Sequence, residues 1–115
     1  MVIVVEHAKF RALLMGDAEL AEISALLAAE VISDVDLLKA GHHGSRNGVT
    51  PLLLQRAKPE VVVISVGRTN DYGHPSPMAL RYYSTSGRRV LRTDLNGDVS
   101  ICVDAIGDYR VDATR

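Results

Sequence analysis

The sequence predicts an α/β fold in which a mixed sheet carries helices on one face. Short apolar runs alternate along the chain with segments of helical character, in the order β-β-α-β-α-β-α-β-β. The run over residues 61–66 is unbroken and rich in β-branched residues, which is typical of a strand covered on both faces. With 115 residues, the chain forms one domain or less.

The first half of the chain predicts two strands, a helix and a third strand. These elements span residues 2–5, 10–15, 18–31 and 35–39. The turn at His7-Ala8-Lys9 joins the first two strands into a hairpin. Gly16-Asp17 ends the second strand, and Asp17 is placed to cap the helix that follows.

The second half begins with a polar loop over residues 41–48. The elements that follow are a helix over 51–58, a strand over 61–66, a helix over 78–86 and strands over 89–92 and 99–103. Thr50 is the expected cap of the first of these helices, with Pro51 at its first position. Asn96-Gly97 predicts a turn that joins the last two strands. The tail from Gly107 is polar and is expected either to add an edge strand or to be loose.

Composition and charge favour an ordinary globular protein. Hydrophobic residues make up 47% and charged residues 23%, and the formal net charge is -1, so no global field attracts nucleic acid or an anionic membrane. Cys102 is the single cysteine, and its apolar surroundings predict a buried, inert thiol. The sequence contains no candidate transmembrane run and no signal-peptide pattern, so we expect a cytoplasmic location.

The candidate chemistry lies in three loops that follow predicted strands. Asp17 follows the second strand, His42-His43 the third, and His74 belongs to the long loop after the fourth. Ligands bind at such strand ends in open α/β sheets, so we expect these loops to converge. A carboxylate with two imidazoles suits Zn²⁺, Mn²⁺ or Fe²⁺, which activate water for hydrolysis.

Each loop also has a purely structural interpretation. Asp17 could serve only as a helix cap, although a capping carboxylate can still offer one oxygen to a metal. His42 and His43 could be surface residues, but flanking glycines would bring them close to a ligand. In the long loop Tyr72 could bind an oxyanion and Arg68 a phosphate, or the loop could be an Ω-loop held by its own side chains. His7 lies far from these strand ends and has no expected role.

Four segments together resemble the metallo-β-lactamase-like hydrolase domain of ComEC-type DNA-internalisation competence proteins. They are FRALLMGDAE (10–19), DLLKAGHHGSRN (36–47), KPEVVVISVGRTNDYGHPSP (58–77) and RVLRTDLNGDVSI (89–101). The resemblance covers nearly the whole chain. It implies an α/β/β/α sandwich and two-metal hydrolysis by a phosphodiesterase or nuclease, with degradation of a DNA strand as the proposed task.

The resemblance also implies roles for individual residues. Asp17 corresponds to the bridging metal ligand, and His42, or alternatively His43, to a ligand of the second metal, Zn or Mn. Tyr72 and His74 correspond to substrate or transition-state contacts, so Asp17, Tyr72 and His74 form the candidate catalytic set. The candidate substrate-binding residues are Ser45, Arg68, Asn70, Tyr72 and His74.

One departure from the family limits what the chain can do alone. The main metal motif of the superfamily, His-x-His-x-Asp-His, is missing, so residues 1–115 correspond to the C-terminal half of that fold. We therefore expect negligible hydrolase activity from the isolated chain. The bare sheet face should pair with a second copy or with an N-terminal half-domain. The alternative is a non-enzymatic, homodimeric binding module built on the same scaffold.

Overall fold

The computed structural model describes residues 1–115, apart from the side chain of Ser86. Its strands are β1 Ile3–His7, β2 Phe10–Leu14, β3 Leu37–Lys39, β4 Val61–Ile64, β5 Arg89–Arg92, β6 Val99–Val103 and β7 Tyr109–Ala113. Its α-helices are α1 Leu20–Ala28, α2 Pro51–Ala57, α3 Pro77–Ser84 and α4 Thr93–Asn96. Short 3-10 turns span Gly41–Gly44, Arg46–Gly48 and Thr85–Gly87.

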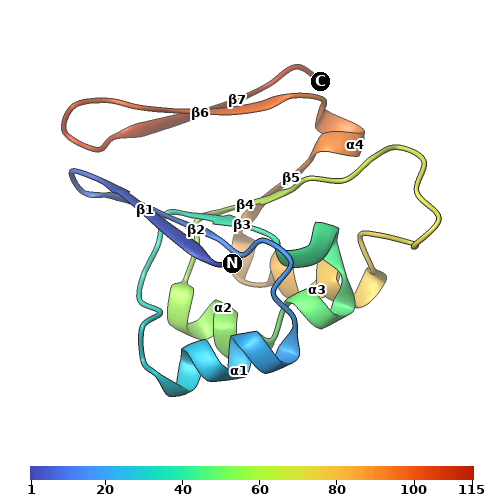
Figure 1. Cartoon of the computed structure of the whole chain (residues 1–115). Helices are drawn as coiled ribbons and strands as arrows, with labels where there is room; N and C mark the ends of the chain where they lie inside the picture. Colours follow the sequence, from blue (N-terminus) through green and yellow to red (C-terminus); the bar gives the residue numbers. More distant parts are fainter.

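The five-stranded sheet is mixed, as the sequence predicts. Its order is β1-β2-β3-β4-β5, with β1 antiparallel to β2 and the other pairs parallel. Helices α1, α2 and α3 all lie on one face of this sheet (Figure 1). Residues in register across the strands, Leu13, Leu38 and Val62, are at most 2% exposed beneath these helices. The prediction of an α/β fold with helices on one face is confirmed.

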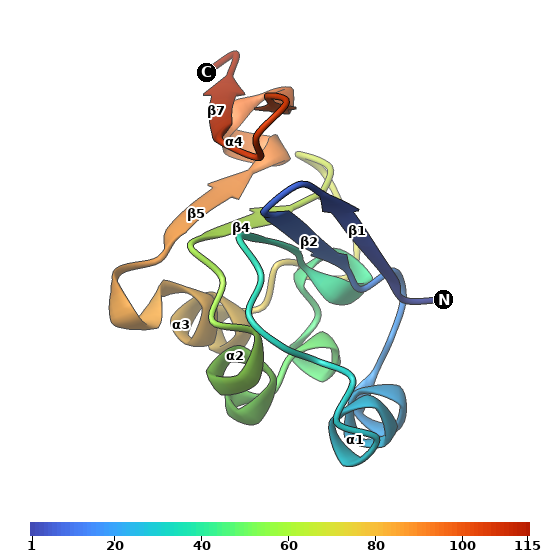
Figure 2. The same ribbon diagram turned by 90° about the vertical axis from the view of Figure 1, so that its left-hand side faces the viewer.

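The opposite face of the sheet is covered in part by this chain itself, so the expectation that it would be bare is wrong for that part. The β6-β7 hairpin forms a second sheet that packs over it (Figure 2). The Tyr109 ring lies 5.4 Å from that of Phe10, and its hydroxyl donates to Glu60 Oε2 at 3.0 Å. Burial and the Glu60 carboxylate raise the pKa of Tyr109 to about 12. Strand β1 lies outside this cover, and Ile3, Val4 and Val5 are 42–44% exposed.

The turn predicted at Asn96-Gly97 does join β5 to β6, but the two strands belong to different sheets. Asn96 belongs to α4, where its Oδ1 accepts the Arg92 backbone N–H at 2.9 Å, so the turn becomes a helical connection between sheets. Strand β6 pairs with β7 instead, and the tail after Gly107 is therefore a strand rather than loose. The burial prediction for Cys102 is wrong. Alternation turns Val99, Ile101 and Val103 toward the sheet and leaves Cys102 exposed.

The helix boundaries correct one candidate role. Helix α1 is capped by Glu19, so the prediction that Asp17 caps it is wrong. The Glu19 backbone N–H donates to Glu22 Oε2 at 3.3 Å, which fixes the helix start two residues later than expected. Helix α2 begins as predicted, with Thr50 Oγ1 accepting the Leu53 N–H at 3.1 Å. Within the part of the chain that the structure describes, no helix has the length and apolarity to span a membrane.

Candidate functional site

Three loops meet at the carboxyl ends of β2, β3 and β4, as the sequence predicts. We call residues 41–45 the histidine loop and residues 65–76 the β4–α3 loop. The His42 backbone N–H donates to Gly16 O at 2.8 Å, which ties the histidine loop to the turn after β2. The Ser76 backbone N–H donates to Gly44 O at 2.9 Å, which ties it to the β4–α3 loop.

Glycines let these loops approach closely. Gly44 has φ +83°, and a Cβ built there would lie 2.6 Å from Pro75 Cβ. Between the loop glycines, His42 and His43 both take left-handed backbone conformations, with φ 46° and 55°. Such conformations cost about 1–3 kcal/mol each and cluster at functional sites. The fold therefore holds both imidazole-bearing residues in an unfavourable backbone state.

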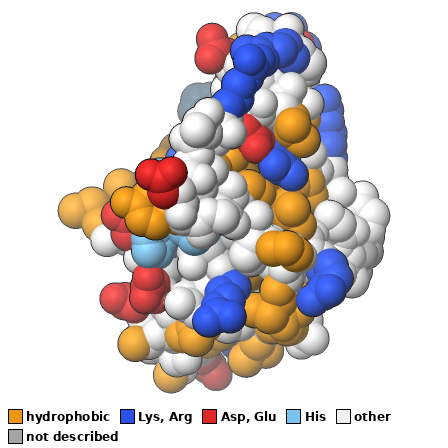
Figure 3. Space-filling model, turned by 90° about the vertical axis from the view of Figure 1, so that its right-hand side faces the viewer, with side chains coloured by type: hydrophobic (Ala, Val, Ile, Leu, Met, Phe, Trp, Pro, Cys, Tyr) orange, Lys and Arg blue, Asp and Glu red, His pale blue; other side chains and the backbone are white. Residues whose placement is uncertain are grey.

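The convergence brings three imidazoles together. The ring centroid of His42 lies 5.8 Å from that of His74 and 6.3 Å from that of His43. His42 and His74 are half-buried, whereas His43 is exposed. On the molecular surface the histidines form a small patch with acidic side chains beside it (Figure 3). His7, the fourth histidine, ends β1 at the turn into β2.

The environment of His74 disfavours its charged form. Burial lowers the pKa of His74, and the neighbouring His42 and His43 lower it further. Its Nδ1 is buried and has no hydrogen-bond partner among the described residues. The Tyr72 ring stacks on the His74 ring, with centroids 5.9 Å apart and an interplanar angle of 19°. The surroundings of His74 thus favour the neutral form of its ring, and an aromatic side chain lies against it.

The β4–α3 loop is held together by Asn70. The Asn70 side chain donates to His74 O at 2.9 Å and to Gly67 O at 3.3 Å, and its Oδ1 accepts the His74 N–H at 3.0 Å. These bonds match the expectation of a loop stapled by its own side chains, and they place Asn70 as the support of His74. Tyr72 is 82% exposed and Arg68 is exposed, so both are accessible to a ligand.

Two other predicted site residues have different surroundings. Ser45 is 5% exposed, and its Oγ accepts the Asn47 N–H at 3.2 Å, so it supports the turn after the histidine loop. Asp17 lies in the exposed turn after β2, next to the Gly16 carbonyl that binds the histidine loop. The structure thus brings His42, His43 and His74 together with Tyr72, and it places Asp17 on the adjoining turn.

Glu19 was not among the residues predicted for the site. Its Oε1 lies 2.8 Å from His42 Nδ1, within ion-pair range, although this nitrogen has no aligned hydrogen-bond partner among the described residues. A sequence signal existed, because Glu19 and Glu22 have the three-residue spacing of reciprocal capping at a helix start. That spacing positions Glu19 at the edge of the site.

The donor set is of the right kind for a metal ion but is incomplete. Imidazole nitrogens and a carboxylate are ligands that Zn²⁺ and Mn²⁺ accept. Across the described residues, however, no three His, Cys, Asp or Glu side chains lie close enough together to hold an ion. The residues of this chain therefore do not form a metal site by themselves.

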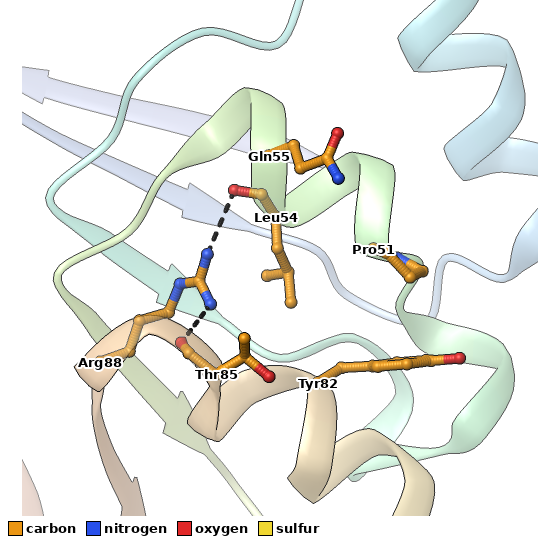
Figure 4. A pocket seen from close by; sticks show the side chains of 6 residues that line it. All are labelled: Pro51, Leu54, Gln55, Tyr82, Thr85 and Arg88. Carbon is orange, nitrogen blue, oxygen red and sulfur yellow. Dashed lines mark hydrogen bonds between the residues drawn. The ribbon is translucent and has the colours of Figure 1, made fainter.

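A separate pocket of about 170 Å³ lies between α2 and α3 (Figure 4). Its lining residues are Pro51, Leu54, Gln55, Tyr82, Thr85 and Arg88. The Arg88 guanidinium donates to Thr85 O at 2.7 Å and to Leu54 O at 3.4 Å, which are carbonyls near the C-terminal ends of the two helices. Arg88 stabilises these helix ends, and none of the predicted site residues lines this pocket.

Comparison with known proteins gives three relatives, all similar to this chain over a short segment of their length. The chain is 32% identical over 100 residues to Recombination protein 2 of Haemophilus influenzae, which is 87% of this chain and 12% of that protein. It is 41% identical over 64 residues to ComE operon protein 3 of Bacillus subtilis, covering 56% of this chain and 8% of the relative. The chain is 38% identical over 61 residues to Competence protein ComA of Neisseria gonorrhoeae, which is 53% of this chain and 9% of that protein.

No family model matches the chain. The chain spans about a tenth of the length of these relatives, between 8% and 12%. One relative is named as a competence protein, one as a product of the ComE operon and one for recombination. The chain is therefore similar to one segment of longer proteins of the competence and DNA-uptake group.

Proposed function

We propose that this chain contributes part of a hydrolytic site to a protein that acts in competence, with a phosphodiester such as DNA as the substrate class. The single observation that carries the proposal is the convergence of three loops, which puts the His42 and His74 rings 5.8 Å apart at the strand ends. The names of the relatives support the competence setting. The sequence resemblance to metal-dependent hydrolases supports the chemistry.

The residues of this chain would supply nitrogen and oxygen ligands, proton transfer and substrate contacts. His42 and His43 would offer ring nitrogens, and Asp17 a carboxylate on the adjoining turn. Tyr72 and Arg68 are the exposed groups of the β4–α3 loop and would face the phosphodiester. Bound Zn²⁺ or Mn²⁺ would polarise the phosphoryl oxygen and lower the pKa of a bound water.

We propose that the missing ligands come from a partner segment. A structural or catalytic zinc site needs three or four protein ligands, and two-metal sites need more. A binding surface exists for such a partner, because Ile3 and Val5 of β1 and Leu14 of β2 share the sheet face outside the β6-β7 cover. A groove of about 260 Å³ lies at the edge of the β6-β7 cover, lined by Leu14 and Lys39 of the large sheet and by Val99 and Ile101 of β6. Exposed apolar surfaces of this kind favour association.

The alternative function is a homodimeric binding module without chemistry. Its support is the same sheet face, because a two-fold axis could bring two copies of β1 and its apolar residues together. The two proposals differ in what they require of the histidines. A binding module needs no metal affinity at the histidine loop, whereas a hydrolytic half-site does.

A Mn²⁺ titration followed by NMR tests the hydrolytic proposal. Paramagnetic broadening of the imidazole signals of His42, His43 and His74 is expected at Mn²⁺ concentrations that leave His7 sharp. The Asp17→Ala and His42→Ala variants should need more Mn²⁺ for the same broadening, while His7→Ala behaves as wild type. Equal broadening of all four histidines, or unchanged behaviour of both site variants, would remove the ligand assignment.

Turnover of bis(4-nitrophenyl) phosphate tests whether the site is incomplete. With Mn²⁺ or Zn²⁺ added, we expect no rate above that of the metal alone. Turnover by the isolated chain that is lost in His42→Ala would show that this chain needs no partner segment.

A further inference from the structure

Both histidines of the histidine loop have Nδ1 next to an oxygen that can only accept a hydrogen bond. His43 Nδ1 lies 2.8 Å from the backbone oxygen of Ser65. A carbonyl oxygen has no proton to give, so the Nδ1 of His43 carries the hydrogen. The lone pair of the neutral His43 ring is therefore on Nε2.

His42 has a carboxylate in the corresponding position. The Oε1 atom of Glu19 lies 2.8 Å from His42 Nδ1, and this ring nitrogen is buried although the His42 side chain as a whole is 37% exposed. A buried polar atom is costly without a partner, and the carboxylate is the acceptor within reach.

The start of α1 fixes the position of Glu19. Glu19 is the N-cap residue, and its backbone N–H donates to Glu22 Oε2. The His42 backbone N–H is held by Gly16 O, three residues before Glu19. The same short segment therefore holds both the backbone and the ring of His42.

We propose that Glu19 is a positioning residue that holds His42 as the Nδ1–H tautomer, with its lone pair on Nε2. Carboxylates and backbone carbonyls do this for histidines that use the other nitrogen as a ligand or proton acceptor. With His43 oriented by Ser65 O, the histidine loop then presents two Nε2 lone pairs. The use of these lone pairs depends on the proposed hydrolytic function, but the tautomer assignment does not.

Long-range ¹H–¹⁵N correlation spectra of the histidine rings test the proposal directly. They are recorded on the whole chain about two pH units above the ordinary histidine pKa of about 6.5, where the rings are neutral. We expect His42 to show a proton-bearing Nδ1 and a bare Nε2. Glu19→Gln should retain this pattern because the amide oxygen also accepts. In Glu19→Ala the two nitrogen signals should move toward those of a free imidazole, in which Nε2–H predominates.

Two controls separate positioning from general destabilisation. Thr50→Ala removes the hydroxyl that caps α2, away from Glu19, and should lower stability without changing the His42 tautomer. His43 should remain Nδ1–H in every variant, because its acceptor is a backbone oxygen.

A wild-type His42 in the Nε2–H form, or an unchanged tautomer in Glu19→Ala, would overturn the proposal. A tautomer change in Glu19→Ala, together with equal Mn²⁺ broadening of all four histidines in the wild type, would support the positioning role and remove the metal-ligand assignment of His42.

Discussion

Replacing Gly44 with alanine perturbs the contact that joins the histidine loop to the β4–α3 loop. The new Cβ would lie 2.6 Å from Pro75 Cβ and 3.1 Å from Ile64 Cγ2, closer than side chains tolerate. Ile64 is completely buried and Pro75 is buried, so neither can move freely. The variant must therefore separate the two loops or strain the core.

The magnitude follows from two contributions. Alanine at φ +83° costs about 1 kcal/mol relative to glycine, because the left-handed region is unfavourable for residues with a Cβ. Overpacking a close contact adds about 1–3 kcal/mol. The free energy of unfolding should thus fall by about 2–4 kcal/mol, a large share of the 5–15 kcal/mol that is typical of natural domains.

Gly87→Ala is the matched control. Gly87 also has positive φ, +72°, but a Cβ built there meets nothing within 4 Å, so only the conformational cost of about 1 kcal/mol applies. Urea unfolding followed by far-UV circular dichroism compares the two variants. With a urea m-value of about 2 kcal/mol/M, the midpoint should fall by about 1–2 M for Gly44→Ala and by about 0.5 M for Gly87→Ala. Equal losses in both variants would refute the close contact between the loops.

Three further predictions concern His74, Thr93 and the exposed sheet face. The pKa of His74 is lowered in the folded chain, so the unfolded chain binds more protons below the ordinary pKa. The free energy of unfolding should therefore fall as the pH drops from neutral through the ordinary histidine pKa of about 6.5. His74→Gln should make this dependence on pH shallower. An equally steep dependence in the variant would contradict a lowered pKa of His74. Thr93 Oγ1 accepts the Val66 N–H and donates to Val66 O, both at 2.8 Å. Thr93→Val should thus lower the free energy of unfolding, measured with urea, by about 1–3 kcal/mol. Thr93→Ser keeps the hydroxyl and should lower it clearly less. Similar losses in both variants would show that the hydroxyl bonds to Val66 do not stabilise the fold. In sedimentation, the average mass of the wild type should rise with protein concentration, whereas Ile3→Lys should stay monomeric. A wild type that is monomeric at all concentrations would exclude self-association through this face.

The sequence was sufficient to predict the helix layer and the convergence of the loops. Parallel strands bring their carboxyl ends to one edge, so residues 16–17, 41–45 and 65–76 had to meet once the strands were assigned. Thr50-Pro51 also predicted the start of α2 correctly. These are local signals, or direct consequences of parallel strand order.

The errors arose where a local signal competes with a tertiary contact. The turn predicted at Asn96-Gly97 is present, but its helical form and the change of sheet were not predicted, because they depend on the Arg92 N–H bond to Asn96 Oδ1. Glu19 rather than Asp17 caps α1, because the Glu19 backbone pairs with Glu22 one turn later. The packing of the β6-β7 hairpin over the five-stranded sheet could not be predicted from local signals. It depends on a contact between Tyr109 and Phe10, which are far apart in the sequence.

The convergence of the histidines follows from the predicted strand order, whereas the roles of the site residues stay predictions. His42, His43 and His74 lie together, and Tyr72 stacks on His74. Ser45 and Asn70, which were expected to contact substrate, are engaged with the backbone of their own loops. Sequence alone could not separate these cases, because a polar side chain that holds a loop and one that faces a ligand look alike until the backbone is in place.

The most direct test of the account is a nuclear Overhauser spectrum of the histidine ring protons. With ring centroids 5.8 and 6.3 Å apart, His42 should give cross-peaks to both His74 and His43, and His74 should give cross-peaks to Tyr72. These contacts should persist without any added metal, since the loops are joined by their own backbone bonds. A spectrum in which His42 contacts His43 but not His74 would show that the loops after β3 and β4 do not meet, and would contradict the proposed site.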